Sequence, residues 1–302
     1  MAQHNISHRQ LLDPVILARL GNIELIARLV VEGFLVGLHK SPYHGFSVEF
    51  AEYRQYNPGD PPKSIDWKVY ARTDKFFVKE FEEETNLRSY ILLDKSASMG
   101  FSHGGRITKF DYARYLAAAL AYLMVRQKDA VGLLTFDERP DDLIPASMTR
   151  VQLMELLKVL AKAAPSGKTK IDTTFLAVAD KLKRRGLIIL ISDLLDDPER
   201  TISAVKHFRH RKNEVVIFHI LDPSEIDFDF KREARFVDME TGNKIPVQPW
   251  MIRDEYREKA KKFFELLKYR CQEFDIDYNL LTTDTPYDIA LLAYLHKRQK
   301  LY

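Results

Sequence analysis

Three oxygen-bearing side chains follow one apolar stretch of the chain at alternate positions. Residues 91–93 are apolar, as in a short buried strand, and Asp94, Ser96 and Ser98 come directly after them. In an extended segment every second side chain points the same way, so the carboxylate and the two hydroxyls can converge on one point. Hard divalent cations prefer such oxygen ligands. The spacing therefore predicts a small metal site in the loop that leaves this strand.

Two other segments could complete the same site. Residues 187–191 form an apolar stretch that is followed by Ser192 and Asp193. Thr169 lies in a Gly-containing loop that opens the helix expected before that strand. Open α/β sheets bind their ligands beyond the carboxyl ends of their strands, where Asp94 and Asp193 would meet. Two carboxylates would roughly neutralise a dication held among neutral hydroxyls.

The elements that position these segments alternate between strand and helix. The pattern predicts apolar strands at residues 91–93, 130–136, 187–191, 215–221 and 278–282, and helices at 107–127, 151–163, 171–185, 198–210, 252–271 and 287–297. Short, continuously apolar strands separated by helices predict an α/β fold with a mostly parallel sheet covered on both faces. A hairpin expected near 233–247 interrupts this alternation.

The first 88 residues have a different pattern. An amphipathic helix is expected at 23–38, and residues 46–50 alternate between apolar and polar as in a half-buried strand. Residues 76–84 can form a strand that turns at 85–86 into a second strand ending at Leu93. We therefore expect a helical and β-rich extension over 1–88 that packs on an α/β domain over 89–302.

Composition and charge exclude several classes of protein. A formal net charge of +3 on 302 residues is too small to predict a nucleic-acid partner. The single cysteine, Cys271, excludes an internal disulfide. Charged residues interrupt the longest apolar stretch, 23–38, whereas a bilayer span needs about 20 nearly uncharged residues. With no signal-peptide pattern at the start of the sequence either, we expect a cytoplasmic protein without a membrane span.

The three candidate metal segments resemble a known site. Asp-x-Ser-x-Ser at 94–98, followed by a loop Thr and a later Asp, resembles the metal-ion-dependent adhesion site of von Willebrand factor A domains. The resemblance implies that Ser96, Ser98 and Thr169 approach Mg²⁺ or Mn²⁺, with Ca²⁺ as a further choice. It also implies that Asp94 and Asp193 lie near the ion, partly through water, and that a partner protein supplies an Asp or Glu as the outside ligand.

A longer string ahead of this loop narrows the resemblance. Residues 50–60 (FAEYRQYNPGD), 64–68 (SIDWK), 71–73 (ART) and 78–84 (VKEFEEE) resemble, in order, the bacterial domain-of-unknown-function family 58 (DUF 58). The resemblance covers nearly the whole chain. Members of that family are commonly associated with MoxR-type AAA+ ATPases, which implies an adaptor or assembly factor.

Two local features of the chain bear on this expectation. Lys170 stands where many von Willebrand factor A domains have Asp, and a cation there would weaken metal binding. The family string also contains a cluster of five polar and aromatic residues: Arg54, Asp60, Asp66, Trp67 and Arg72. These residues could form a partner-binding surface or a buried ion-pair knot, and we favour the second interpretation.

Other functions stay open for the same residues. A metal-dependent phosphohydrolase or phosphotransferase could use Asp94 as phosphoryl acceptor. Such enzymes place a second Asp two residues on, where this chain has Ser96, and a hydroxyl cannot act as a general acid near neutral pH. A structural module with an empty loop would use the same side chains to cap the following helix. We expect a non-enzymatic, protein-binding role.

Overall fold

A six-stranded sheet forms the centre of the computed structural model, which describes residues 13–40, 53–56, 67–79, 88–168, 185–239 and 242–300 together with positions 65, 175 and 179. The strand order is β10-β7-β6-β3-β4-β5. Every neighbouring pair is parallel except β4 and β5. The strands are β3 (Arg88–Asp94), β4 (Ala130–Phe136), β5 (Pro140–Ser147), β6 (Leu187–Ser192), β7 (Glu214–Leu221) and β10 (Asp277–Thr282). The mostly parallel α/β sheet expected from the sequence is confirmed.

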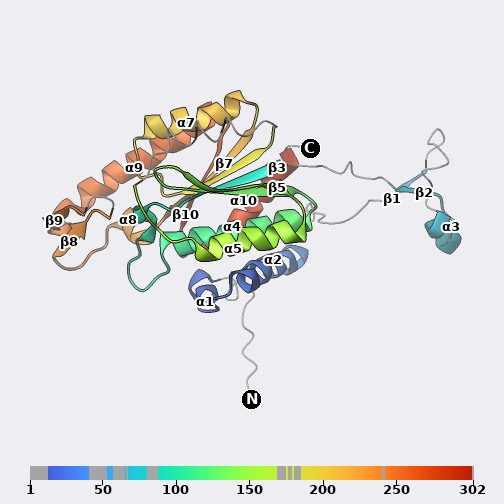
Figure 1. Cartoon of the computed structure of the whole chain (residues 1–302), viewed down its shortest axis with the longest axis horizontal. Coiled ribbons are helices and arrows are strands. Elements are labelled where there is room, and N and C mark those ends of the chain that lie inside the picture. Colours follow the sequence, from blue (N-terminus) through green and yellow to red (C-terminus); the bar gives the residue numbers. More distant parts are fainter. Residues whose placement is uncertain are drawn as a thin grey trace, which may run out of the picture.

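Helices cover both faces of this sheet (Figure 1). One face carries α4 (Lys109–Arg126), α5 (Arg150–Lys162) and α10 (Tyr287–Lys300), and the other carries α7 (Pro198–His210) and α9 (Pro249–Glu273). Each face has its own apolar core. All six residues of β6 are buried, because side chains on both sides of the strand meet a helical layer.

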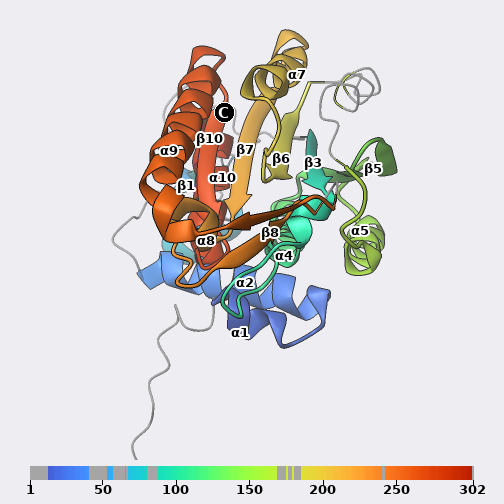
Figure 2. The same ribbon diagram turned by 90° about the vertical axis from the view of Figure 1, so that its left-hand side faces the viewer.

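The N-terminal helices add a further layer outside α4. These are α1 (Pro14–Ala18) and α2 (Ile23–Lys40), and Figure 2 shows them beneath α4. The core on this face includes Ile26, Val30 and Phe34 from α2. Buried between the sheet and α2, α4 is apolar on nearly all sides, as a helix enclosed by two layers must be.

Another part of the N-terminal region lies apart from the sheet (Figure 1). There β1 (Tyr53–Gln55) pairs antiparallel with β2 (Phe77–Lys79), and α3 (Trp67–Thr73) lies between them in the sequence. The expected hairpin of residues 76–84 with the strand ending at Leu93 was wrong, because β2 pairs with β1 and β3 enters the central sheet. The domain boundary at residue 88 stays a prediction, since 80–87 lie outside the described residues.

The cluster expected as a buried ion-pair knot lies only partly within the described residues. Trp67 is 57% exposed and packs edge-on against Tyr70 and Phe76, and Arg72 is exposed. These two side chains are therefore not part of a buried knot. The side chains of Arg54, Asp60 and Asp66 lie outside the described residues.

Two features on the other strands complete the fold. The hairpin expected near 233–247 consists of β8 (Ala234–Val237) and β9 (Lys244–Val247), which pair antiparallel. The edge strand β5 was not predicted, because Pro140, Asp141 and Pro145 hide its strand pattern. The helix expected at 171–185 and the strand at 46–50 lie outside the described residues, except that Phe175 and Ala179 are helical and buried. No helix among the described residues is long and apolar enough to span a bilayer.

Candidate metal centre

Two carboxylates meet at the carboxyl end of the central sheet. Strands β3 and β6 are parallel neighbours with Leu93 opposite Ile191, so Asp94 ends one strand beside Ser192 and Asp193 on the other. Asp94 is fully buried and Asp193 is 1% exposed. The structure thus brings together the two acids that the sequence pattern placed at one sheet edge.

Short hydrogen bonds fix the carboxylate of Asp94 in place. Its Oδ1 accepts the backbone N–H of Ser96 at 2.8 Å, and its Oδ2 accepts the hydroxyl of Ser192 at 2.6 Å. The chain then enters a short 3-10 helix, η3 (Ala97–Gly100). The Oγ atoms of Ser96 and Ser98 lie 3.1 Å apart. Both hydroxyls predicted as metal ligands therefore lie side by side next to the carboxylate.

The loop that leads to Thr169 lies against the same segment. Ser166 donates its N–H to the carbonyl of Lys95 at 2.7 Å, and Ala97 donates to the carbonyl of Gly167 at 3.1 Å. The Lys95 ammonium also pairs with Asp137 at 2.9 Å. Thr169 itself lies outside the described residues, as does Lys170. That Thr169 ligates the metal stays a prediction. The structure does show that the loop leading to Thr169 lies against residues 95–97.

The two acids differ in their electrostatic environments. Burial, and then the negative charge of Asp193, raise the pKa of Asp94 to about 7. Burial also opposes ionisation of Asp193, but the Lys109 ammonium and a hydrogen bond from Ser98 hold the pKa of that carboxyl below its ordinary value. Without a bound cation, Asp94 is therefore the acid whose ionised form is disfavoured.

A buried lysine at this edge was not among the predicted site residues. Lys109 donates to Asp193 Oδ2 at 2.8 Å and to Glu225 Oε1 at 2.7 Å, and its side chain is 1% exposed. Although burial opposes the charged form, these two carboxylates hold the pKa of Lys109 above its ordinary value. A signal existed in the sequence, because a lysine in the first turn of a helix opposes the helix dipole and calls for an acid nearby.

The second partner of Lys109 belongs to a rigid turn after β7. Helix α8 (Pro223–Asp227) begins with a capping box in which Asp222 accepts from Ser224 and Glu225 accepts from the Asp222 N–H. Asp222 is fully buried and also accepts the N–H of His103 at 3.0 Å. Because these bonds occupy Asp222, that acid holds loops together and does not join the metal site.

The residues present fit a divalent cation held by carboxylates and hydroxyls. When Asp94 is ionised, three carboxylates (Asp94, Asp193 and Glu225) and one ammonium (Lys109) leave two negative charges in a region with little access to water. A dication would neutralise them. Among the described residues, no group of three or more His, Cys, Asp or Glu side chains is arranged to hold a metal ion. The fit therefore depends on the hydroxyls of Ser96 and Ser98 as much as on the acids.

Comparison with known proteins places the chain in a family. The model of the family described as "Protein of unknown function DUF58" matches residues 52–263. The chain belongs to the DUF58 family. An uncharacterized protein of Mycobacterium tuberculosis (strain ATCC 25618 / H37Rv), Rv1480, is 28% identical to this DUF58 chain over 258 residues, which cover 82% of this chain and 78% of the relative.

Solved structures also resemble the DUF58 chain. The von Willebrand factor domain of the type V pili tip protein Mfa5 from Porphyromonas gingivalis aligns with 70% of this chain and 95% of that chain, at 14% identity and a TM-score of 0.39. The crystal structure of an aerotolerance-related membrane protein from Bacteroides fragilis NCTC 9343 aligns with 71% of this chain and 99% of that chain, at 16% identity and a TM-score of 0.50. The latter likeness shows the fold alone. The α/β fold expected from the sequence, a mostly parallel sheet with helices on both faces, is confirmed, whereas the metal, its ligands and its partner stay predictions.

Proposed function

We propose that this protein is a non-enzymatic adaptor or assembly factor that binds a partner protein through a divalent cation. One observation supports this function above the others: two buried carboxylates end neighbouring strands, and two adjacent hydroxyls follow one of them. The proposed ligands are Asp94, Ser96, Ser98, Thr169 and Asp193. Mg²⁺ or Mn²⁺ suits this set best, with Ca²⁺ as the alternative.

The chain's own residues hold the site in a fixed geometry. Ser192 and the backbone of Ser96 each bond one oxygen of Asp94, so that carboxylate cannot rotate without breaking a bond. Lys109 donates to Oδ2 of Asp193, and the N–H of Leu195 donates to Oδ1 at 3.4 Å. When bound, the cation would supply an electrophilic centre that accepts a carboxylate oxygen from outside. Ser98 is only half-buried, so this side of the site faces solvent, where a partner's Asp or Glu could approach.

The same geometry disfavours the phosphotransfer alternative. Ser96, at the position where such enzymes need a second acid, is fully buried and its hydroxyl lies against Ser98. The nearby ammonium of Lys109 is shared between two carboxylates, which leaves it unsuited to bind the oxygens of a phosphate. We therefore assign the site to binding.

Exposed apolar residues of the β8–β9 hairpin offer a second contact for the partner. The methyl group of Met239, at the tip of the β8–β9 hairpin, lies against Gly100 of η3, where an added Cβ would come within 3.4 Å of it. Met239 is 46% exposed, Val237 48% and Ile245 62%. We propose that these three residues, named here the hairpin patch, contact the partner while the cation takes its carboxylate. By family resemblance the favoured partner is a MoxR-type AAA+ ATPase or its client in the cytoplasm.

Calorimetric titration of Mn²⁺ and Mg²⁺ into the wild-type protein and Asp94→Ala tests the metal site. We expect binding by the wild type and its loss in the variant. The control is Asp275→Ala, which removes an acid that is 80% exposed at the amino end of β10, far from the site. This control should bind metal as the wild type does. Equal titrations for Asp94→Ala and the wild type would rule out the assignment.

Capture of a purified MoxR-type ATPase on the immobilised protein tests the partner. We expect retention in Mg²⁺ and release by a chelator. Retention that is equal with chelator, or equal for Asp94→Ala, would show that the metal does not mediate this contact.

A further inference from the structure

The outer edge of strand β10 differs from the opposite edge of the sheet. Strand β5 protects its edge with Pro140 and Pro145 and with two register shifts against β4, which are common devices against pairing with another chain. Strand β10 contains no proline and pairs with β7 in unbroken register from Asp277 to Thr282. In the described part of the chain, nothing pairs with its other side.

Alternation along β10 identifies the backbone groups on this free edge. Thr283 donates its N–H to the carbonyl of Leu221 on β7 at 2.9 Å. In a parallel pair, the N–H and C=O of one residue point to the same side and those of the next residue to the other. Residues 277, 279 and 281 therefore face β7, while Tyr278 and Leu280 direct their N–H and C=O outward.

The chain itself satisfies the outward N–H groups at both ends of this run. Ile276 donates to the carbonyl of Cys271 at 2.9 Å, and Thr282 donates to Thr285 Oγ1 at 3.0 Å. Only Tyr278 and Leu280 are left with outward donors that no described residue accepts. Unpaired backbone groups at an edge are a template for an added strand. Here the template consists of the outward groups of Tyr278 and Leu280.

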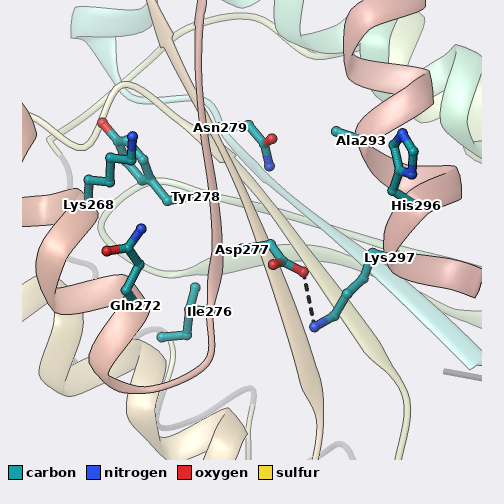
Figure 3. Close-up of a pocket in the computed structure, with 9 residues that line it drawn as sticks. All are labelled: Lys268, Gln272, Ile276, Asp277, Tyr278, Asn279, Ala293, His296 and Lys297. Atoms are coloured by element: carbon teal, nitrogen blue, oxygen red, sulfur yellow. Dashed lines mark ion pairs between the residues drawn. The ribbon is translucent and has the colours of Figure 1, made fainter. Parts of the chain in front are cut away.

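A cavity of about 350 Å³ lies over the first half of this edge, residues 276–279, between α9 and α10. Figure 3 shows Tyr278 on the side of Lys268 and Gln272, and Asn279 on the side of Ala293 and His296. Tyr278 is anchored there by a 2.7 Å hydrogen bond to His219. The two walls therefore have different side chains, so an added strand would be recognised by what it presents to each face.

Charge distinguishes the two walls further. Lys297 pairs with Asp277 at 3.0 Å and with Glu214 at 2.8 Å, so its charge is already balanced. Lys268 is exposed and has no ion pair with any described residue. An acidic side chain on the occupant would find its partner on this wall, while a small apolar side chain would face Ala293.

We propose that the free edge of β10 binds an extended peptide segment of a partner protein, in which acidic residues facing Lys268 alternate with apolar residues facing Ala293. The peptide would add a strand to the sheet through Tyr278 and Leu280, a mode in which backbone hydrogen bonds give affinity and alternate side chains give specificity. Strands β7 and β6 separate this edge from Asp94. The site thus goes beyond the metal-dependent contact and does not require it.

Fluorescence anisotropy with a labelled synthetic peptide, acetyl-Val-Glu-Val-Glu-Val-Glu-Val-amide, tests the proposal. Leu280→Pro removes one outward N–H and leaves the bonds to β7 intact, whereas Leu280→Ala keeps that N–H and serves as the matched control. Because the proline removes one hydrogen bond, we expect its Kd to rise about tenfold, with the alanine variant within about twofold of wild type. Lys268→Glu should also weaken binding about tenfold, and a chelator should change nothing.

Several outcomes would overturn the proposal. These are no binding at about 1 mM peptide, equal binding of a Val-Lys peptide, and wild-type affinity in Leu280→Pro. A wild-type dimer in sedimentation that Leu280→Pro converts to monomer would assign the edge to a second copy of the chain instead. If Leu280→Pro does not fold by circular dichroism, Lys268→Glu and a backbone N-methylated Val-Glu peptide decide the question, since the methylated peptide should not bind.

Discussion

The ammonium of Lys109 lies 2.8 Å from Asp193 Oδ2, and both side chains are 1% exposed. A buried ion pair of this kind adds little net stability, but removal of one partner leaves an uncompensated buried charge. Here the pair also shares an acid with the proposed metal site. Lys109 therefore keeps Asp193 ionised and in place. It also neutralises part of the negative charge that would otherwise attract a dication.

Replacement of Lys109 by Met should separate these two effects. Without metal, the unpaired carboxylates of Asp193 and Glu225 should lower the free energy of unfolding by about 3–5 kcal/mol. The same loss of positive charge should lower the Kd for Mn²⁺ by roughly tenfold, because the site becomes more negative. Urea unfolding in chelator and calorimetric titration measure the two quantities. Lys109→Arg, which keeps the charge, is the control. Weaker metal binding in Lys109→Met would show that Lys109 supports the ion instead of competing with it.

Asp94→Asn should reveal the cost of the buried acid through its pH dependence. With a pKa of about 7, Asp94 in the folded chain keeps a proton that the unfolded chain releases near pH 4. Without metal, the free energy of unfolding of the wild type should therefore fall, through this group, as pH rises from about 4 to 7. The Asn variant lacks this loss, so its stability relative to wild type should increase by up to about 4 kcal/mol across the window.

Urea unfolding of both proteins in chelator, at pH 4 and pH 8, measures this difference. Asp137→Asn, which changes an acid paired with Lys95 outside the cluster, is the matched control. A difference between Asp94→Asn and wild type that is the same at both pH values would mean that Asp94 ionises normally in the folded chain.

The positions of the two acids at the strand ends could be predicted from the sequence. The buried lysine beside them and the pairing of β2 with β1 could not. Asp94 and Asp193 could be placed together because short apolar stretches fix where parallel strands end, and parallel strands end at one edge. Lys109 was missed because its place in the first turn of a helix indicates only that an acid lies nearby. Which acids these are depends on the tertiary approach of α4 to both Asp193 and Glu225. The pairing of β2 with β1 was missed for a similar reason, since contacts across 22 residues or more compete with a nearer turn.

The single thiol of Cys271 should be unreactive in the native protein. It is fully buried in the core formed by α7, α9 and the sheet. Burial raises its pKa to about 12, and thiolate is the reactive form. We expect no reaction with a disulfide reagent at pH 8 in native buffer and complete reaction in denaturant, measured by absorbance. Rapid labelling under native conditions would show that α9 separates readily from the sheet.

The hairpin patch should affect partner binding without affecting the metal. Val237, Met239 and Ile245 expose apolar surface on the β8–β9 hairpin, which reaches η3 through Met239. None of the three carries an oxygen that could ligate the ion through its side chain. A combined change to Ser at these three positions should leave the Mn²⁺ titration unchanged. It should weaken capture of the purified MoxR-type ATPase by about tenfold or more, because exposed apolar residues near the centre of an interface carry much of its energy. Val151→Ser, which changes a residue that is 79% exposed on α5, is the control for loss of surface apolarity alone. If the triple variant and this control capture the ATPase as the wild type does, the partner contacts the metal site from a direction that avoids the hairpin.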